Sequence, residues 1–143
     1  MSVSAILNEK GGTVFTVRRE TSIAEACAEL ARRRIGAIVV TDDDGRVGGI
    51  LSERDIVRRL AEHGPAVLQM TVGECMTAEV ESCRREDSIV DVMTRMTHGR
   101  FRHFPVIEND RLAGLISIGD VVKHRIEEAE REAAQIREYI TMS

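Results

Sequence analysis

The spacing of apolar residues along the chain alternates between a helical and a strand-like pattern. Apolar residues recur every three or four positions after Ser22 and again after Ser88, which is typical of the buried face of a helix. The runs Ala37–Thr41 and Phe104–Glu108 are almost continuously apolar instead, as in buried strands. Both serines stand three residues before an acidic residue, the spacing of a capping box. We therefore expect a helix to begin at each serine and a buried strand to follow it.

The second half of the chain repeats the first half. Arg18–Ile23 recurs as Arg84–Ile89 at an offset of 66, and Gly49–Val57 recurs as Gly114–Val122 at an offset of 65. A duplication of this kind indicates two copies of one structural unit. Each copy is too small to bury enough surface to be stable alone, so we expect the two to pack together.

Two further segments extend this repeat. Val3–Leu7 resembles Val72–Met76 at an offset of 69. The middle strands match at an offset of 67, which pairs Ala37 with Phe104. The small differences in offset are explained by residues added or lost in the connections between elements.

Each half of the chain predicts the order β-α-β-β-α. An extended segment comes first, at Val14–Val17 and at Val80–Cys83, and the helix and the middle strand follow. Turn-forming residues at 42–45 and at Asn109–Asp110 lead to a second strand, which runs into another helix. We expect an α/β (α+β) fold in which the two repeats pack sheet to sheet around a shared core with pseudo-twofold symmetry. The expected boundaries are 1–62 for the first repeat, 63–71 for a linker, 72–126 for the second repeat and 127–143 for a helical extension.

The last helix differs from its counterpart in the first half because its pattern continues much further. We expect it to run from Asp120 to about Tyr139. Its apolar residues alternate at spacings of four and three, which is the seam of a coiled coil: Val122, Ile126, Ala129, Ala133, Ile136 and Ile140. The seam could fold back on its own domain or pack against a second chain. The second interpretation is favoured, since the seam extends well past the point where the first repeat's helix ends.

Composition excludes several classes of function. The net charge of −4 and the aromatic content of 3%, with no Trp, argue against a nucleic-acid partner. The sequence contains no apolar run of about 18 residues and no basic start followed by a long apolar stretch, so we expect neither a membrane span nor a secretory signal. Three cysteines without CxxC spacing predict neither a disulfide framework nor a zinc site, and the histidines show no metal-ligand spacing. We therefore expect a cytoplasmic protein without a metal site.

One stretch concentrates the candidate chemistry. Gly114–Val122 ends an apolar run in Ser117, and Asp120 follows three residues later, where a helix begins. A helix start offers free backbone N–H groups, here beside a hydroxyl and a carboxylate, and such a corner can hold a ribose and a phosphate. The same spacing is also that of ordinary helix capping. Ser52 and Asp55 form the matching corner of the first repeat.

These duplicated motifs resemble a known family. Gly49–Asp55, Cys75–Thr77, Arg102–Val106 and Leu115–Asp120, in this order, are similar to the motifs of a tandem pair of cystathionine-β-synthase (CBS) domains, also called a Bateman module. The resemblance covers the chain from about Val3 to Ile126 and is closest to the stand-alone bacterial type. It implies that adenosine ligands such as AMP, ATP, NAD or S-adenosylmethionine bind in clefts between the repeats.

The resemblance also implies roles for the residues around Asp120. The aspartate would accept hydrogen bonds from ribose hydroxyls, while Ser117 and the backbone at Gly119 would face ribose or phosphate. Arg102 and His103 would contact the phosphates.

Around these residues the two repeats differ. Arg100 would share a face with Arg102 on an extended segment. Matched at the offset of 67, the first repeat has Ile35 and Gly36 at the positions of Arg102 and His103, so the Asp55 corner would lack this pair. Arg54, or Lys10 from the longer preceding loop, would replace it there. On this basis we expect the Asp120 corner to be the stronger site.

Residues at the expected strand edges would form the adenine pocket: Val14, Thr16, Ala37, Val80 and Pro105. The resulting hypothesis is a regulatory module that senses AMP, ATP or NAD(H) and signals by a change of conformation to an unknown partner. It would assemble as a homodimer or tetramer through its repeat helices and its C-terminal helix. The alternative is a structural protein that acts through the C-terminal helix and whose ligand sites are vestigial. The sequence contains no assembled set of catalytic residues, so we do not expect an enzyme.

Overall fold

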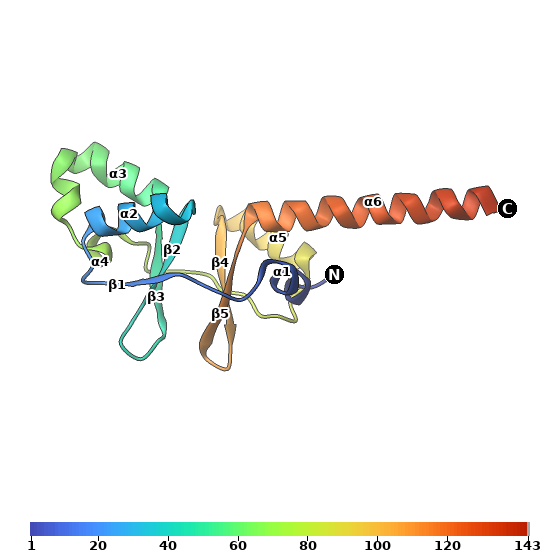
Figure 1. Ribbon diagram of the computed structural model, residues 1–143, viewed down its shortest axis with the longest axis horizontal. Helices are drawn as coiled ribbons and strands as arrows, with labels where there is room; N and C mark the ends of the chain where they lie inside the picture. The colour runs from blue at the N-terminus through green and yellow to red at the C-terminus, as the bar shows by residue number, and fades with distance from the viewer. Residues whose placement is uncertain (143) are drawn as a thin grey trace.

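Two β-hairpins lie side by side at the centre of the molecule, and helices cover each hairpin on the side that faces away from the other (Figure 1). The computed structural model describes residues 1–142, so the last position of the expected extension 127–143 lies outside the described residues. The first repeat has the predicted order β-α-β-β-α, whereas the second has the order α-β-β-α and ends in the predicted long helix.

The first repeat forms a three-stranded sheet. Its elements are β1 (Thr16–Arg18), α2 (Ile23–Arg33), β2 (Ala37–Thr41), β3 (Val47–Ser52) and α3 (Glu53–His63). β1 is parallel to β2, which pairs with β3 in antiparallel fashion. The strand expected at Val14–Val17 is therefore present but begins two residues later.

The second repeat has a smaller sheet than predicted. Its elements are α5 (Ile89–Gly99), β4 (His103–Glu108), β5 (Arg111–Ser117) and α6 (Ile118–Met142). The strand expected at Val80–Cys83 is reduced to one bridge, between Cys83 and Val106. Of this segment only Cys83 is buried, and it is the residue that exchanges backbone hydrogen bonds with β4, through Pro105 and Ile107.

The helices begin where the sequence predicts. The Ser22 and Ser88 hydroxyls accept hydrogen bonds from the backbone N–H groups three residues later, at 3.2 and 3.0 Å. These bonds satisfy two of the N–H groups that a helix start leaves free. Both helices end at an arginine in the left-handed region, Arg34 with φ 54° and Arg100 with φ 59°. Arg100 is thus a helix cap and not part of the extended segment expected from the sequence.

The short helices that precede each repeat pack into the other repeat. α1 (Val3–Lys10) contributes Val3, Ile6 and Leu7 to the core of the second repeat. α4 (Val72–Cys75) contributes its two buried side chains to the core of the first repeat, and η1 (Gly64–Gln69) adds Val67. The segment expected as a linker is therefore partly a structured element of the first repeat.

The buried apolar side chains form two clusters, and the shared core expected from the sequence is wrong. The first-repeat cluster comprises Val17, Ile23, Ala26, Leu30, Ile38, Val40, Leu51, Val67, Val72 and Cys75. The second-repeat cluster comprises Val3, Ile6, Leu7, Cys83, Ile89, Val92, Met96, Phe104, Val106, Ile116 and Val121. Each sheet has its own helices on one face, so each repeat buries its own cluster. Three further residues, Ala37, Val39 and Ile50, are buried but belong to neither cluster.

The two hairpins also correct the alignment of the middle strands. Ala37 pairs with Ser52 in the first hairpin, and His103 pairs with Ser117 in the second. Ala37 therefore corresponds to His103, at an offset of 66, and not to Phe104. A shift by one residue turns a strand side chain to the opposite face, and both Ile38 and Phe104 indeed enter their cores.

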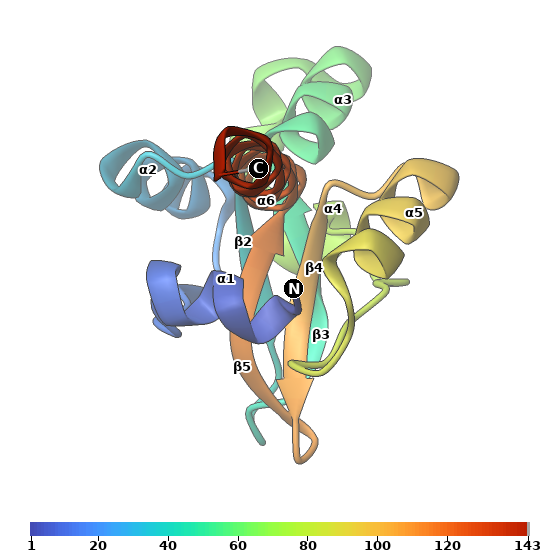
Figure 2. The same ribbon diagram turned by 90° about the vertical axis from the view of Figure 1, so that its right-hand side faces the viewer.

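α6 extends far beyond the two repeats (Figure 1), and Figure 2 shows it nearly end-on in front of them. It has 25 residues, and all described residues from Ala129 onward are exposed. Its first turns pack through the buried residues Val121 and His124. None of the helices in the described part of the chain is long and apolar enough to cross a membrane.

Candidate functional site: two pockets between the repeats

The candidate site is built on two corners at which a strand runs into a helix. In the first repeat the Ser52 N–H donates to Asp55 Oδ2 at 2.9 Å, and the Asp55 N–H donates to Ser52 Oγ at 3.2 Å. In the second repeat the Ser117 N–H donates to Asp120 Oδ2 at 2.9 Å, and the Asp120 N–H donates to Ser117 Oγ at 3.1 Å. Both corners are therefore reciprocal capping boxes, and a ligand would have to use the acceptor capacity that capping leaves.

The Asp55 carboxylate is buried but can still accept a further hydrogen bond. Asp55 is 7% exposed. Asp55 Oδ2 also accepts from the Ser52 hydroxyl at 3.0 Å, and Oδ1 accepts from the Thr77 hydroxyl at 3.1 Å. A carboxylate offers about four acceptor sites, and three are used here. Oδ1 can therefore accept one further hydrogen bond.

A pocket of about 330 Å³ opens beside this carboxylate, and both repeats line it. Its lining residues are Gly36, Ile50, Ser52, Glu53, Arg54, Asp55, Arg58, Thr77, Glu79, Val80, Arg100, Phe101, Arg102 and His103. Arg54 and Arg58 come from α3, whereas Arg100 and Arg102 come from the segment before β4. Four guanidinium groups face three carboxylates here, a balance that favours an anionic ligand.

A second pocket, of about 280 Å³, lies beside the Asp120 corner. It is lined by Lys10, Thr13, Val14, Phe15, Ile35, Gly36, Ala37, His103, Leu115 and Ser117. Lys10 Nζ donates to Asp120 Oδ2 at 2.7 Å and to the Leu115 carbonyl at 2.9 Å. An internal ammonium group thus already binds the carboxylate that a ribose would use.

Charge and burial set the protonation of this second corner. Burial alone would raise the pKa of Asp120, but the hydrogen bonds from Lys10 and Ser117 outweigh it and hold that pKa below its ordinary value. Burial, and after it the charge of Lys10, lowers the pKa of His103. At neutral pH we therefore expect an ionised Asp120 and a neutral His103, which can still donate one hydrogen bond.

The structure exchanges the cationic residues that the sequence assigned to the two corners. Arg100 and Arg102 line the Asp55 pocket, and His103 lines both pockets. Lys10, expected at the Asp55 corner, lies at Asp120 instead. The segments before β2 and β4 lie between the two corners, since Gly36 and His103 line both pockets. Lys10 reaches Asp120 from the end of α1, which packs in the second repeat. The Asp120 corner was expected to be the stronger site because Arg102 was placed there. Arg102 lines the Asp55 pocket instead, so this reason does not hold.

The remaining predicted residues divide among several places. Arg54 lines the Asp55 pocket, as expected. Gly119 lies exposed in the first turn of α6. The predicted adenine residues are distributed as follows: Val14 and Ala37 line the Asp120 pocket, Val80 lines the Asp55 pocket, and Pro105 lines a separate hollow. Thr16 is exposed on β1 and is not among the residues that line these pockets.

The sequence reasoning missed eleven of the residues that line these two pockets, including Thr77, Arg58 and Phe15. Thr77 and Arg58 line the Asp55 pocket, and Phe15 lines the Asp120 pocket beneath the Arg33 guanidinium, which lies 3.6 Å from the ring centre. The sequence placed Phe15 within the expected strand Val14–Val17, and only the structure, in which β1 begins at Thr16, shows it in the preceding loop. Thr77 belongs to the motif Cys75–Thr77, but nothing in the sequence shows that its hydroxyl binds Asp55.

One further cluster bears on the expectation that the protein has no metal site. Glu9, His124 and Glu127 lie close enough for their ligand atoms to fall within 4.8 Å of one another. The Glu9 carboxylate already pairs with His124 Nε2 at 3.1 Å and with Lys123 Nζ at 3.3 Å. These contacts hold Glu9 in the cluster, and the absence of a metal site stays a prediction.

Comparison with known proteins identifies the two repeats. A family model for the CBS domain matches the chain twice, at residues 5–62 and 72–127. The CBS domain-containing protein CBSCBSPB1 of Arabidopsis thaliana is 34% identical over 119 residues, which are 83% of this chain and 22% of that protein. An uncharacterized 17.7 kDa protein of Acidianus ambivalens is 33% identical over 111 residues, which are 77% of this chain and 66% of the relative. The chain thus spans only part of the length of these two relatives.

Solved structures share the fold over nearly their whole length. A CBS-domain-containing protein from Agrobacterium tumefaciens is 50% identical, with a TM-score of 0.85, over 87% of this chain and 99% of that chain. The CBS domain pair of protein MJ0100, solved in complex with 5′-methylthioadenosine and S-adenosyl-L-methionine, is 23% identical, with a TM-score of 0.80, over 90% of this chain and 98% of that chain. From the two family matches and the two α/β repeats with exchanged helices, we conclude that the chain belongs to the CBS-domain family and contains a tandem pair of CBS domains.

Proposed function

We propose that this CBS pair is a regulatory module that binds an adenosine-containing ligand, such as AMP, ATP or NAD(H), between its repeats. The observation that carries the proposal is the Asp55 pocket, which four arginines line together with a buried carboxylate that has one free acceptor site. A ligand with phosphate at one end and hydroxyl groups at the other complements such a pocket.

Each part of the pocket supports one part of the ligand. The Arg54, Arg58, Arg100 and Arg102 side chains would bind phosphate oxygens, since a guanidinium group donates two parallel hydrogen bonds. Asp55 Oδ1 would accept a bond from a ribose hydroxyl, next to the Thr77 hydroxyl that it already binds. The apolar side chains of Ile50 and Val80 would contact the adenine ring.

The Asp120 pocket would bind a ligand more weakly. Lys10 Nζ is 2.7 Å from Asp120 Oδ2, so a ribose would first have to displace it. Phosphate binding there would depend on Lys10 and on neutral His103, not on a group of arginines. We therefore propose that the Asp55 pocket is the principal site.

Regulation would follow from the position of the pocket between the repeats. Residues of both repeats line it, so a ligand that prefers one arrangement of the repeats would shift the population toward that arrangement. An unknown protein would then respond to the shift.

We propose no catalytic role for this pocket. The Asp55 carboxylate accepts hydrogen bonds from Ser52 and Thr77 and has no partner for proton transfer among them.

Self-association would complete the module. Apolar side chains are exposed on two repeat helices, with Val57 63% and Leu60 46% exposed on α3 and Val90 48% exposed on α5. We propose that these faces and α6 form the interfaces of a homodimer or tetramer.

The cytoplasmic location stays a prediction. One relative, CBSX3 of Arabidopsis thaliana, carries the word mitochondrial in its name.

Calorimetric titration tests the proposed ligand site. AMP, ATP, NAD and S-adenosylmethionine are the ligands to compare, because the distant relative MJ0100 was solved with S-adenosyl-L-methionine. We expect Arg102→Ala to weaken binding by about tenfold or more, since a hydrogen bond to a charged group contributes about 1.5–3 kcal/mol. The matched control is Arg111→Ala, an exposed arginine at the start of β5, which should bind unchanged.

The two corners can be ranked in the same titration. Asp55→Asn should weaken binding more than Asp120→Asn, because the arginines lie at the Asp55 pocket. Circular dichroism of both variants checks that each remains folded. The opposite ranking would contradict the assignment of the principal site, and no binding of any of the four ligands at millimolar concentration would refute the proposed function.

The alternative is a structural protein that acts through α6, with vestigial ligand pockets. The exposed seam residues Ile126 and Ile136, 54% and 60% exposed, favour this second candidate. It predicts that Ile126→Glu abolishes assembly and cellular function, whereas Asp55→Asn leaves both intact. The ligand-sensing proposal predicts a loss of regulation in Asp55→Asn.

A further inference from the structure

We propose that α6 pairs with α6 of a second copy of this chain as a parallel, in-register coiled coil. The inference rests on the self-association proposed above but not on the ligand site. It adds the direction of the two helices, which neither the family matches nor the fold specifies.

The seam of α6 points away from the helix's own module. Val122 is 42%, Ile126 54% and Ile136 60% exposed. Val121 and His124 are buried among the first turns, His124 against Glu9 of α1. At 100° per residue the seam lies about a quarter turn from Val121, so it remains accessible on the single chain.

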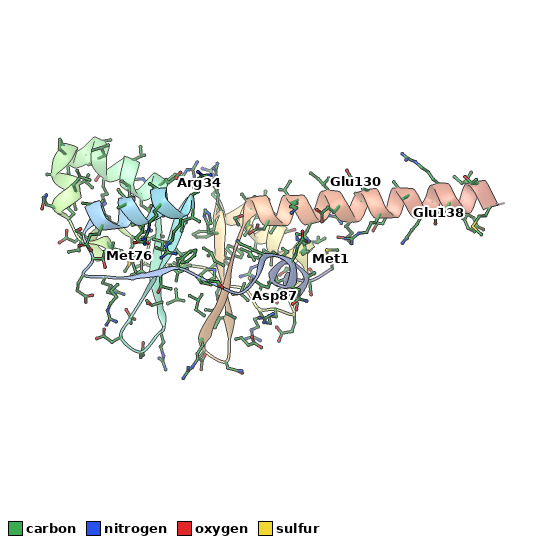
Figure 3. The ribbon with its side chains drawn as sticks, in the orientation of Figure 1. Met1, Arg34, Met76, Asp87, Glu130 and Glu138 are labelled. Carbon is green, nitrogen blue, oxygen red and sulfur yellow. The ribbon has the colours of Figure 1, made fainter. Side chains whose placement is uncertain are left out.

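The heptad positions of α6 follow from the spacing of the seam. Val122, Ala129 and Ile136 are d positions, and Ile126, Ala133 and Ile140 are a positions. The g position lies one residue before each a position, which places Arg125 and Glu132 at g. The e position lies one residue after each d position, which places Lys123, Glu130 and Arg137 at e. Figure 3 shows Glu130 on the part of the helix that extends beyond the repeats.

The charges at these flanking positions match a parallel partner. In a parallel coiled coil a g residue meets the e residue five positions later on the other helix. Arg125 therefore meets Glu130 of the second copy, and Glu132 meets Arg137 of the second copy. By symmetry both contacts occur twice, so all four flanking pairs join opposite charges. The Arg125 side chain is 40% exposed, and its present partner is Glu128 on the same helix, at 3.4 Å. Pairing with the second helix would replace this surface ion pair.

An antiparallel partner in full overlap would meet like charges. With every a residue facing a d residue, Glu130 faces Glu130, Glu132 faces Glu132 and Lys123 faces Arg137. Sliding one helix by a heptad removes these repulsions. Only four of the six seam residues of each helix then remain in contact, and the other two lose their partner. Only the parallel arrangement combines the complete apolar seam with attraction along both flanks.

Disulfide cross-linking of the full-length protein tests the direction. Cys75 and Cys83 are buried, and Cys27, which is partly exposed, is replaced by serine. On that background Ile136→Cys should form a disulfide-linked dimer under mild oxidation, because the two d residues of a parallel pair face each other. Glu138→Cys, two residues away on the opposite face, is the matched control and should not cross-link. If Ile136→Cys instead links only to an Ile126→Cys chain mixed with it, the helices are antiparallel and the proposal is overturned.

Charge exchange tests the flanking pairs with the same readout. Glu130→Arg places Arg125 against an arginine and should slow cross-linking through position 136 by about tenfold. The combination Arg125→Glu with Glu130→Arg restores the attraction and should restore the rate. If the combination stays as slow as Glu130→Arg, the parallel pairing is wrong. Nucleotide titration of the same variants separates the proposals, since their affinities should match that of the unchanged protein.

Discussion

At the scale of single residues, Lys10 decides how the two corners differ. Both corners have the same serine and aspartate in the same capping geometry. Only Asp120 also carries a bound ammonium group, since Lys10 Nζ donates to its carboxylate and to the Leu115 carbonyl. Asp55 is bound by the neutral Thr77 hydroxyl instead. Under the proposed function, a ligand would compete with a charge at Asp120 and would find an open acceptor at Asp55.

The Lys10–Asp120 pair should make a pH-dependent contribution to stability. The pKa of Asp120 is lower in the folded protein than its ordinary value of 3.8. The contribution is therefore complete above that value and is lost as the pH falls through the lower, folded pKa. We expect Lys10→Met to be less stable than the unchanged protein at neutral pH and the difference to shrink below about pH 4.

Urea unfolding of Lys10→Met and of the unchanged protein, at neutral and at acid pH, measures this difference. Lys123→Met is the control, because its ion pair with Glu9 lies outside the corner. A difference that is equally large in acid would show that Lys10 acts through packing and not through the Asp120 charge.

At the scale of elements, two glycines allow the exchanged segments to cross the hairpins. A methyl group at Gly49 would lie 2.6 Å from the Thr77 carbonyl oxygen and 2.8 Å from Met76 Sδ. A methyl group at Gly114 would lie 2.6 Å from Leu7 Cδ2. The glycine that opens the duplicated motif is thus explained by close approach of the segment contributed from outside the hairpin.

The two glycines should respond differently to substitution. Gly49→Ala collides with backbone, which cannot move away, and should cost about 1–3 kcal/mol of the free energy of unfolding. Gly114→Ala meets the end of a flexible leucine side chain and should cost less. Gly119→Ala, whose added methyl would lie 3.5 Å from Ser117 Oγ, is the neutral control. Chemical denaturation ranks the three variants, and an equal cost at Gly49 and Gly119 would contradict the explanation.

At the scale of the whole molecule, the exchange of α1 and α4 joins the two CBS domains. Val3, Ile6 and Leu7 are each at most 3% exposed, in the core of the second domain. Val72 and Cys75 are buried in the core of the first. Neither domain is complete without a helix that lies next to the other in the sequence, so the pair should fold as one unit.

Removal of residues 1–10 should therefore loosen the second domain more than the first. Each fully buried aliphatic side chain contributes about 1.5–3 kcal/mol, and α1 contributes three to that core. Amide hydrogen exchange should accelerate more at Phe104 and Ile116 than at Ile38 and Leu51. A greater loss of protection in the first domain would show that α1 belongs to the domain that follows it in the sequence.

Local patterns in the sequence determined much of the fold. The duplication, the helix starts at Ser22 and Ser88 and the length of α6 depend on residues close together in the chain, so they could be predicted. The Ser–Asp corners are equally local, because a capping box involves four consecutive residues. The strand at Val80–Cys83 was predicted wrongly because only tertiary contacts determine which residues of an extended segment are buried.

The sequence by itself determined the two Ser–Asp corners and most of the candidate cations, and only the tertiary structure decided which of these residues meet. Arg102 lies 15 positions from Ser117 in the sequence, yet it lines the pocket at Asp55, and Lys10 crosses from the N-terminal helix to Asp120. The offset of the middle strands could not be decided from similar apolar runs, because a slip of one residue leaves the composition almost unchanged but reverses the faces. The pairing of the corners with their cations is a property of how two separate cores dock, and no pattern within one repeat contains it.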